Sequence, residues 1–284
     1  MKEAASYLRV FLTFARNSLV RDMTFRTNFL LESLASLSWM LANLGFYLLI
    51  FSHTRYIGRG SGWGQYEFFV FLSTTMFVNS LVQAFFMANV DEFSEMIRTG
   101  RLDFALLKPI DTQFVISLQK IDWSSLVNFA AGGVLLAFSL VKLAARPANP
   151  LQLEPLMAVL YTLYVLCGVA ILYSLMIALS ATSIWLGRNQ TLYDFWFYIT
   201  NFSRYPMEIY SGPWGRPLRW VFTFLVPVLV VVNVPARLLA QPLRPETSLH
   251  WTLAAFAIVA TVASLAASRW VFNRALTSYR SASS

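Results

Sequence analysis

Side chains with catalytic or metal-binding potential are few and scattered in this sequence of 284 residues. The two histidines, His53 and His250, and the single cysteine, Cys167, lie far apart, which predicts neither a cysteine metal cluster nor a disulfide within the chain. No glycine precedes a lysine at phosphate-loop spacing, and neither a His-Glu-x-x-His sequence nor a nucleophile elbow is present. The adjacent carboxylates Asp91 and Glu92 are interpreted as a solvated helix end. We therefore expect that the chain is not an enzyme and holds no cofactor, nucleotide or metal of its own.

The segments that carry these residues are long and apolar. Hydrophobic residues make up 57% of the chain and charged residues 13%, whereas soluble domains have about 45–50% and about 25%. A helix needs about 20 residues to cross the hydrocarbon core of a bilayer, which is roughly 30 Å thick. The pattern predicts one all-α domain over residues 1–284, a polytopic membrane protein with six transmembrane helices. The expected spans are residues 28–51, 66–90, 123–142, 155–186, 191–210 and 249–272.

Basic residues gather in the connectors and tails, as the positive-inside rule expects, so the net charge of +8 indicates a lipid bilayer rather than a nucleic acid as partner. Residues 1–27, residues 91–122 and the C-terminal end each carry three or more basic residues, and an even number of crossings puts them on one side. Both termini are therefore expected in the cytoplasm. Charges inside apolar runs usually mark ion pathways. Few ionisable residues lie in the apolar runs of this chain, and Glu32, Asp194 and Arg204 are the exceptions. A proton-coupled carrier would need more such residues.

Residues 1–27 are predicted to form an amphipathic helix and not a cleaved signal peptide, because charges interrupt the segment throughout. Lys2, Arg9 and Arg16 recur every seven residues, while apolar residues such as Leu8 and Leu12 lie on other faces. Such a helix can lie on the inner leaflet with its basic residues near anionic headgroups. A cytosolic helix packed on the first span accounts for the pattern nearly as well.

Two interpretations are open for the region between the fourth and last spans. In the first, Leu218 to Ala240 is the fifth span and the aromatic stretch before it is cytoplasmic, which the positions of the basic residues favour. In the second, a tight inner turn at Gly187–Gln190 leads into a fifth span over residues 191–210. Residues 214–240 then form a broken hairpin that enters the membrane from the outer side.

Two prolines favour the second interpretation. Pro227 and Pro235 enclose a short apolar run, which a straight spanning helix would seldom contain. Irregular backbone at membrane depth is possible where protein or a cavity covers it.

The connector between the second and third spans, residues 91–122, is the most distinctive segment. Glu95 and Arg98 lie three residues apart on its expected helix and support each other modestly. Gly100 is placed to end that helix in a left-handed cap. An apolar patch follows, formed by Leu102, Phe104, Leu106 and Leu107. A short amphipathic element joined to two spans suits docking into a partner's groove, and an interfacial helix on lipid headgroups is the alternative.

The sequence Ile-Arg-Thr-Gly-Arg-Leu-Asp-Phe-Ala-Leu-Leu-Lys-Pro-Ile-Asp, which ends at Asp111, resembles the cytoplasmic loop of a bacterial branch of type-2 ABC exporter permeases. The segment Phe202-Ser-Arg-Tyr-Pro206 and the stretch from Val226 to Ala236 are also similar to that branch. So is the order of elements along essentially the whole chain. The loop motif is fairly specific, whereas the other two segments would be weak alone.

The resemblance implies a six-span permease of the bacterial cytoplasmic (inner) membrane that pairs with a second permease chain, identical or related. It further implies two copies of a separate ATPase subunit, which would hold the ATP and Mg. The loop and the N-terminal helix would contact that ATPase, and an outer re-entrant hairpin would follow the fifth span. The positions that match the coupling loop and its preceding helix are Glu95, Arg98, Gly100, Leu102, Asp103, Leu107, Lys108, Pro109 and Asp111. The positions that match the outer hairpin are Tyr205, Pro206, Pro227 and Pro235.

We therefore expect the membrane subunit of an ATP-driven efflux system. A stand-alone secondary carrier and a membrane-embedded enzyme or scaffold are the alternatives. The aromatic cluster between Tyr193 and Phe202 suits a cavity for a small hydrophobic or lipid-like substrate, although an interfacial aromatic belt explains it as well.

Overall fold

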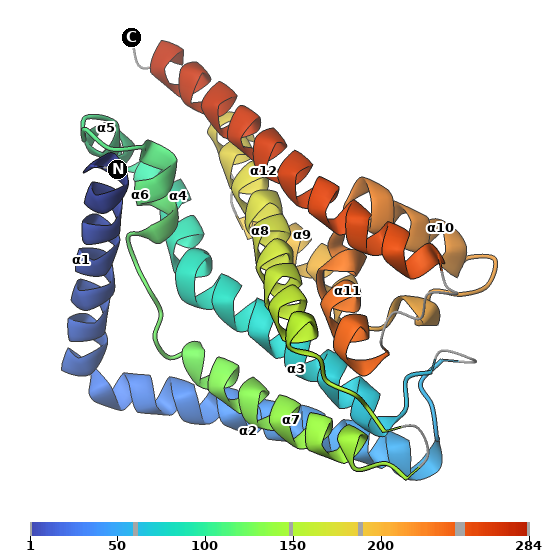
Figure 1. Ribbon diagram of the computed structural model, residues 1–284. Helices are drawn as coiled ribbons and strands as arrows, with labels where there is room; N and C mark the ends of the chain where they lie inside the picture. The colour runs from blue at the N-terminus through green and yellow to red at the C-terminus, as the bar shows by residue number, and fades with distance from the viewer. Residues whose placement is uncertain (1, 59–61, 148–149, 187–189, 242–247, 283–284) are drawn as a thin grey trace.

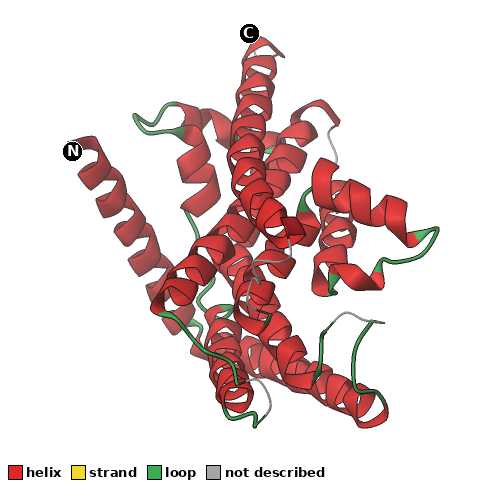
Figure 2. Ribbon diagram, turned by 45° about the vertical axis from the view of Figure 1, so that its right-hand side comes forward, coloured by secondary structure: helices red, strands yellow, loops and turns green. Residues whose placement is uncertain are grey.

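The computed structural model describes residues 2–58, 62–147, 150–186, 190–241 and 248–282. Helices and the turns between them make up this part of the chain, and it contains no strand (Figure 2). The all-α prediction is confirmed. The turn expected at Gly187–Gln190 lies largely outside the described residues.

The helices of the first half of the chain are α1 (Lys2–Thr24), α2 (Arg26–His53), α3 (Gln65–Val82), α4 (Ala88–Arg98), α5 (Arg101–Leu106), α6 (Thr112–Leu118) and α7 (Leu126–Ala144). A π-helical turn at Gln83–Met87 joins α3 to α4. The second half contains α8 (Pro155–Leu186), α9 (Gln190–Asn201), α10 (Gly215–Trp220), α11 (Val228–Ala240) and α12 (Ser248–Ala282). Short 3-10 turns occupy Phe202–Arg204 and Met207–Ile209, and a second π-helical turn occupies Val221–Leu225.

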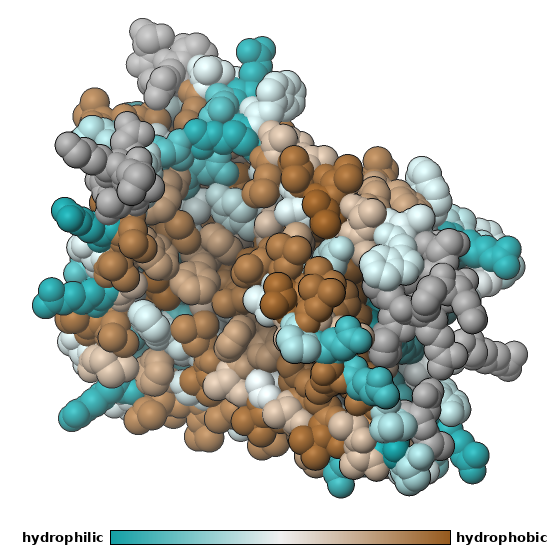
Figure 3. Space-filling view, viewed as in Figure 1, coloured by the Kyte–Doolittle hydropathy of each residue, from teal (hydrophilic) through white to brown (hydrophobic). Residues whose placement is uncertain are grey.

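Helices long and apolar enough to cross a membrane cover most of the described chain. They are Arg26–His53, Gln65–Arg98, Leu126–Ala144, Pro155–Leu186 and Trp251–Tyr279. These five stretches coincide with five of the six expected spans. Hydrophobic side chains cover the broad middle of the face in Figure 3, and hydrophilic ones gather toward its margins. The polytopic membrane class predicted from composition is confirmed.

The bundle has two ends with different contents. The start of α1, helices α5 and α6, and the end of α12 lie together at one end, which we call the inner end (Figure 1). The connectors after α2 and after α7 lie at the opposite, outer end. There the Arg146 side chain after α7 forms an ion pair of 2.5 Å with Glu67 at the start of α3. The start of α1, the connector over residues 91–122 and the end of α12, which are expected on the same side of the membrane, therefore share one end of the bundle.

Residues 191–210, which are expected to form the fifth span, are not one continuous helix. The helix α9 ends at Asn201 after 12 residues, a rise of about 18 Å, which is shorter than the roughly 30 Å of a hydrocarbon core. Tyr205 is extended, with φ −125° and ψ 146°, because the following Pro206 disfavours helical backbone at the residue before it. Aromatic residues continue in the sequence after Asn201, so the end of α9 is not apparent from the apolar pattern. The chain nevertheless reaches the outer end, where Glu208 accepts a hydrogen bond of 2.8 Å from Trp63 Nε1.

The straight span from Leu218 to Ala240 is wrong. Residues Gly215–Leu225 and α11 meet at 88° around Pro227. The pair starts after Glu208 at the outer end and finishes at Gln241, which lies against Gly62 of the outer connector. A segment that starts and finishes at the same end has the geometry of the hairpin in the second interpretation.

Helix α11 is the centre of the packing at this end. All of its residues are buried, against α8, α3 and α12. Pro235 lies inside the helix and does not end it. Proline lacks an N–H, so the carbonyl of Val231, four residues earlier, is left without its helical donor. This carbonyl points at Gly168 of α8, where a Cβ would lie only 2.7 Å from the oxygen, and the absent side chain lets the two helices approach.

Candidate functional site at the inner connector

The tip of the inner connector, residues 91–122, follows its sequence pattern closely. Arg98 and Glu95 form an exposed ion pair of 2.7 Å on the last turn of α4. Gly100 follows with φ +70°, the left-handed conformation expected of a helix cap. A Cβ at Gly100 would meet no atom within 4 Å. The backbone conformation, and not the available space, is what favours glycine at this turn.

Helix α5 has one buried and one exposed side. Leu102 is fully buried in the core and Ala105 is 3% exposed, whereas Phe104 is 70% and Leu107 81% exposed. Leu102 therefore anchors α5 to the bundle, and its part in coupling stays a prediction. Phe104 and Leu107 project from the inner end as unpacked apolar side chains. Exposed residues of the same tip are Asp103, Lys108 and Pro109.

Asp111 is a junction between three parts of the chain. Its backbone N–H donates to the Tyr7 hydroxyl of α1 at 3.2 Å. Its carboxylate accepts from the Phe114 N–H at 2.9 Å, which caps α6. The same carboxylate accepts hydrogen bonds from the two terminal guanidinium nitrogens of Arg269 in α12, at 3.0 and 2.5 Å. Planar paired contacts of this kind fix orientation as well as distance.

Gln113 extends this junction to a fourth helix. Its amide oxygen accepts from Arg269 at 2.9 Å, and its amide nitrogen donates to the Tyr173 hydroxyl of α8 at 3.0 Å. The Tyr173 hydroxyl also lies 2.8 Å from Ser117 Oγ of α6. We call Tyr7, Asp111, Gln113, Tyr173 and Arg269 the Asp111 cluster. Through it α6 is fixed to α1, α8 and α12 at once.

The charge state of Asp111 is set by this surrounding. The hydrogen bonds from Arg269 hold the pKa of the Asp111 carboxyl below its ordinary value, and the Phe114 N–H acts in the same direction. Burial opposes both, because it disfavours the charged form. The lowered pKa keeps the carboxylate ionised and the link to α12 intact at neutral pH.

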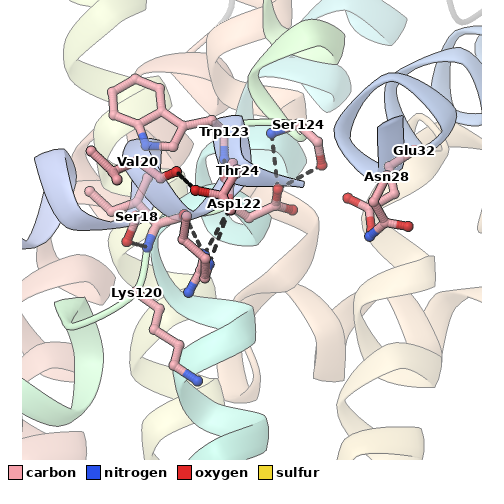
Figure 4. A network of polar contacts seen from close by, with 12 residues as sticks. Ser18, Val20, Thr24, Asn28, Glu32, Lys120, Asp122, Trp123 and Ser124 are labelled. Atoms are coloured by element: carbon pink, nitrogen blue, oxygen red, sulfur yellow. Dashed lines mark hydrogen bonds and ion pairs between the residues drawn. The ribbon is translucent and has the colours of Figure 1, made fainter. Parts of the chain in front are cut away.

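The far end of the connector is tied to α1 (Figure 4). Ser18 Oγ accepts the Ile121 N–H at 3.0 Å, and Trp123 Nε1 donates to the Ala15 carbonyl at 3.3 Å. The Asp122 carboxylate folds back to accept from Ser124 at 2.9 and 2.6 Å. The N-terminal helix is thus fastened along the connector and not along the first span. Its Leu8, Leu12 and Leu19 side chains are exposed.

The end of the connector also contacts α4, the helix at its start. Asn89 Nδ2 donates to the Lys120 carbonyl, and the Lys120 N–H donates back to Asn89 Oδ1, both at 2.7 Å. Glu92 pairs with Lys120 at 2.6 Å and with Arg101 at 3.3 Å. The interpretation of Glu92 as a merely solvated carboxylate is wrong. Polar contacts therefore join the start of the connector to its end.

A groove separates α1 from the turn between α5 and α6. Its volume is about 580 Å³, and it opens at the inner end. Its walls are Tyr7, Val10 and Phe14 from α1 and Lys108, Pro109, Ile110 and Val115 from the connector. The groove lies between the two segments whose sequences point to partner contacts.

The residues expected in the outer hairpin lie at or near a second polar cluster. Pro206 is buried before the turn that carries Glu208, and Tyr205 is 44% exposed. Glu208 forms an ion pair with Arg237 of α11, whose guanidinium also lies over the Trp63 ring at 5.6 Å. Asn233 Oδ1 accepts the Met207 N–H at 2.9 Å. This outer cluster holds α11 against the start of the hairpin.

Sequence reasoning found the connector but missed the residues that fix it. Tyr7, Gln113, Tyr173 and Arg269 lie in four separate segments, and no local spacing relates them. Arg269 carried one signal, because it is a charge near the inner end of an apolar helix. Among the described residues, no group of three or more His, Cys, Asp or Glu is placed to hold a metal ion.

The chain was also compared with known proteins. A family model described as "ABC-2 family transporter protein" matches residues 37–283. No curated protein and no solved structure matches the chain.

Proposed function

The chain belongs to the ABC-2 family of transporter proteins, and on this premise we propose that it is the permease subunit of an ATP-driven exporter. In this proposal the chain forms the substrate path, and separate ATPase subunits hold the ATP and Mg. Two ATPase copies and a second permease chain, identical or related, complete the complex. Its place is the bacterial inner membrane, with both termini in the cytoplasm. Membership of a transporter family disfavours the enzyme and scaffold alternatives, and the scarcity of intramembrane charges disfavours a carrier that works alone.

The observation that carries the proposal is the Asp111 cluster. Asp111 and Gln113 join α6 to α1, α8 and α12 through bonds of 2.5 to 3.2 Å. A force applied to the connector therefore reaches several long helices without passing through a flexible loop. Energetic coupling needs contiguous packed or hydrogen-bonded elements of this kind.

The contact surface for the ATPase is the tip of the connector together with the groove beside α1. Phe104 and Leu107 are exposed apolar side chains at the inner end, and Lys108 and Pro109 line the groove. An apolar anchor at the centre of an interface, with polar residues at its rim, is the usual arrangement of binding hot spots. Asp103, Arg98 and Glu95 form that rim in this proposal.

In the proposed cycle, ATP-driven closure of the ATPase pair pushes the connector tip. The left-handed turn at Gly100 holds α5 at a fixed angle to α4, and Leu102 anchors α5 in the core. The push tilts α8 and α12 through Tyr173 and Arg269 and changes the access of the path from inner to outer. The outer hairpin around Pro227 is the element that opens or closes the outer exit.

The experiment compares two glycine substitutions in the chain co-expressed with its ATPase. Gly100→Ala forces a side chain into a left-handed backbone at a cost of roughly 1–2 kcal/mol, which shifts the connector tip. We expect transport-linked ATP turnover to be lost while the assembled complex can still be purified. Asp103→Asn is expected to reduce turnover in the same way.

Gly45→Ala is the matched control, because a Cβ at Gly45 in α2 would also meet no atom within 4 Å and its backbone is helical. This variant should keep wild-type turnover. Undiminished transport and ATP turnover in the Gly100 variant would contradict the coupling role. Failure of any ATPase subunit to co-purify with the unaltered chain would contradict the proposed function as a whole.

A further inference from the structure

A polar pocket lies along the middle of α2 and α3, away from the inner connector. It has a volume of about 180 Å³, and α7 and the turn after α9 complete its walls. Four side-chain amides line it: Asn43, Asn79, Gln83 and Asn128. Trp39, Met40, Leu72 and Met76 supply apolar wall, and Arg204 is the one charged residue among the lining side chains. Polar groups at the depth of apolar helices are costly unless they have partners.

One side-chain amide of this pocket, that of Asn128, has an unpaired oxygen, whereas Asn43 Nδ2 donates to the Trp39 carbonyl of its own helix at 2.8 Å. Asn128 Oδ1 is shielded from solvent and accepts no hydrogen bond within the described chain. Elsewhere the buried amides are paired: Asn89 binds the Lys120 backbone twice, and Asn233 binds both Met207 and Leu229. A buried polar atom left unpaired costs free energy that a bound ligand can recover. The contrast indicates that the Asn128 amide is placed for a ligand.

Arg204 indicates the sign of the charge that a ligand of this pocket would carry. Its guanidinium lies 5.4 Å from the centre of the Phe197 ring, and no carboxylate of the described residues forms an ion pair with it. A guanidinium beside amide donors is suited to a carboxylate, phosphate or sulfate group. The pocket therefore fits a group with negative charge.

The dimensions of the pocket fit a headgroup and not a whole molecule. Pockets that enclose drug-sized ligands have volumes of about 300–1,000 Å³, and this pocket is smaller. Its open side borders α2, which is largely unburied along its length and exposes Trp39 to 70%. An apolar tail attached to the headgroup would run out over this surface.

The pocket has a larger neighbouring cavity at the start of α2. A second cavity of about 700 Å³ is lined by Asn28, Glu32, Asp122 and other residues at the start of α2 and the end of the connector, and it shares Ser36 with the pocket. Figure 4 shows Asn28 and Glu32 on α2 facing Asp122 and Ser124 across this space. The carboxylates Asp22, Glu32 and Asp122 line this second cavity, so a negatively charged group is better placed in the pocket beside Arg204.

We propose that this pocket binds the anionic headgroup of an amphipathic substrate, with Arg204 as its charge partner and the amides of Asn79, Gln83 and Asn128 as hydrogen-bonding groups. The inference rests on the proposed transport function and names the substrate class for it. The apolar tail of the substrate stays in contact with α2.

The test measures binding of cis-parinaric acid, a fluorescent fatty acid, to the full chain in phosphatidylcholine nanodiscs without ATPase. Arg204→Gln should weaken binding roughly tenfold or more, because it removes a charge-assisted contact. Arg204→Lys should retain part of the affinity. Asn128→Leu should weaken binding by a smaller factor, and the methyl ester of the probe should bind the unaltered chain as poorly as the acid binds Arg204→Gln.

Arg216→Gln is the matched control, because Arg216 is an exposed arginine of the hairpin that does not line the pocket. Equal affinity of the unaltered chain and Arg204→Gln would overturn the inference. Equal losses in Arg204→Gln and Arg216→Gln would also overturn it, since they would show attraction to surface charge. Size-exclusion profiles confirm that each variant is folded. Because the probe binds without ATPase, a loss of coupling with retained Arg204-dependent binding would count against the proposed function alone.

Discussion

The two ends of the bundle are both held by arginine–carboxylate pairs, but in opposite surroundings. At the outer end Arg237 pairs with Glu208 beneath the Trp63 ring, and its side chain is only 9% exposed. At the inner end Arg269 pairs with Asp111, and the two side chains are 46% and 32% exposed. The outer pair fastens a fully buried helix, whereas the inner pair fastens a connector whose tip is open to solvent.

The difference teaches what each end is built to do. A buried pair is strongly destabilising to break, because one charge is left without compensation. A half-exposed pair contributes little to stability and can exchange with water at low cost. The outer cluster is therefore a fixed clamp on α11, and the Asp111 cluster is a link that transmits position without dominating stability.

The largest effect expected is from Glu208→Ala. The substitution leaves Arg237 buried beside Trp63 without its carboxylate, and we expect a loss of about 3 kcal/mol or more in the free energy of unfolding. Thermal unfolding of the purified chain, followed by size exclusion, measures the change. Glu95→Ala removes an exposed pair instead and should change stability little. Equal stability of the two variants would break the contrast between the ends.

The next largest effect expected is steric, at the contact between α8 and α11 in the outer half of the bundle. Gly168→Ala would place a Cβ 2.7 Å from the Val231 carbonyl oxygen, so α8 and α11 must move apart. We expect a loss of about 1–3 kcal/mol, as for other overpacked cores. Gly133→Ala in α7 is the control, because a Cβ there meets no atom within 4 Å. If both variants unfold at the same temperature, the close approach of α8 and α11 is not important for stability.

The third effect separates stability from coupling at the inner end. Arg269→Gln should change the free energy of unfolding by no more than about 1 kcal/mol, since the pair is half-exposed. The same variant should lower transport-linked ATP turnover several-fold, because α12 loses its link to α6. Arg274→Gln, further along α12 and also exposed, should leave turnover unchanged. A variant at Arg269 with low stability and normal turnover would reverse the assignment of the two ends.

The smallest effect expected is a pH dependence. Arg269 holds the pKa of Asp111 below its value in the unfolded chain, so the pair stabilises the fold above that unfolded pKa, which is about 3.9. This contribution is lost as the pH falls through the lowered pKa of the folded chain. The difference in unfolding temperature between the unaltered chain and Asp111→Asn should therefore be constant near neutral pH and vanish in strong acid. A difference that grows toward acid would contradict the sign.

Much of the fold follows from local sequence. The apolar runs predict five long helices because length and hydropathy are local properties, and the Gly100 cap follows from one residue type at one position. The break within the expected fifth span was not predicted, because aromatic residues continue the apolar pattern past Asn201, where α9 ends. Pro235 suggested an interrupted helix, yet α11 continues through it. Tertiary packing against Gly168 supports the helix at this point.

The candidate site was predictable only at its tip. Exposure of Phe104 and burial of Leu102 depend on how α5 packs, and an apolar patch in the sequence does not reveal which of its residues face outward. The Asp111 cluster joins residues that are more than 100 positions apart, such as Tyr7 and Asp111. The positions of such partners follow from helix packing and not from spacing along the chain.

The most direct test of the account is co-purification of the ATPase subunit with a chain that carries Phe104→Asp and Leu107→Asp together. Both side chains are exposed, so the chain should fold normally, and charges in place of the apolar anchors should remove the ATPase from the complex. Trp214→Asp is the matched control at the hairpin, because Trp214 is 89% exposed there, and this variant should retain the ATPase. An ATPase that stays bound to the doubly substituted connector, or is lost equally from the Trp214 variant, would contradict the account.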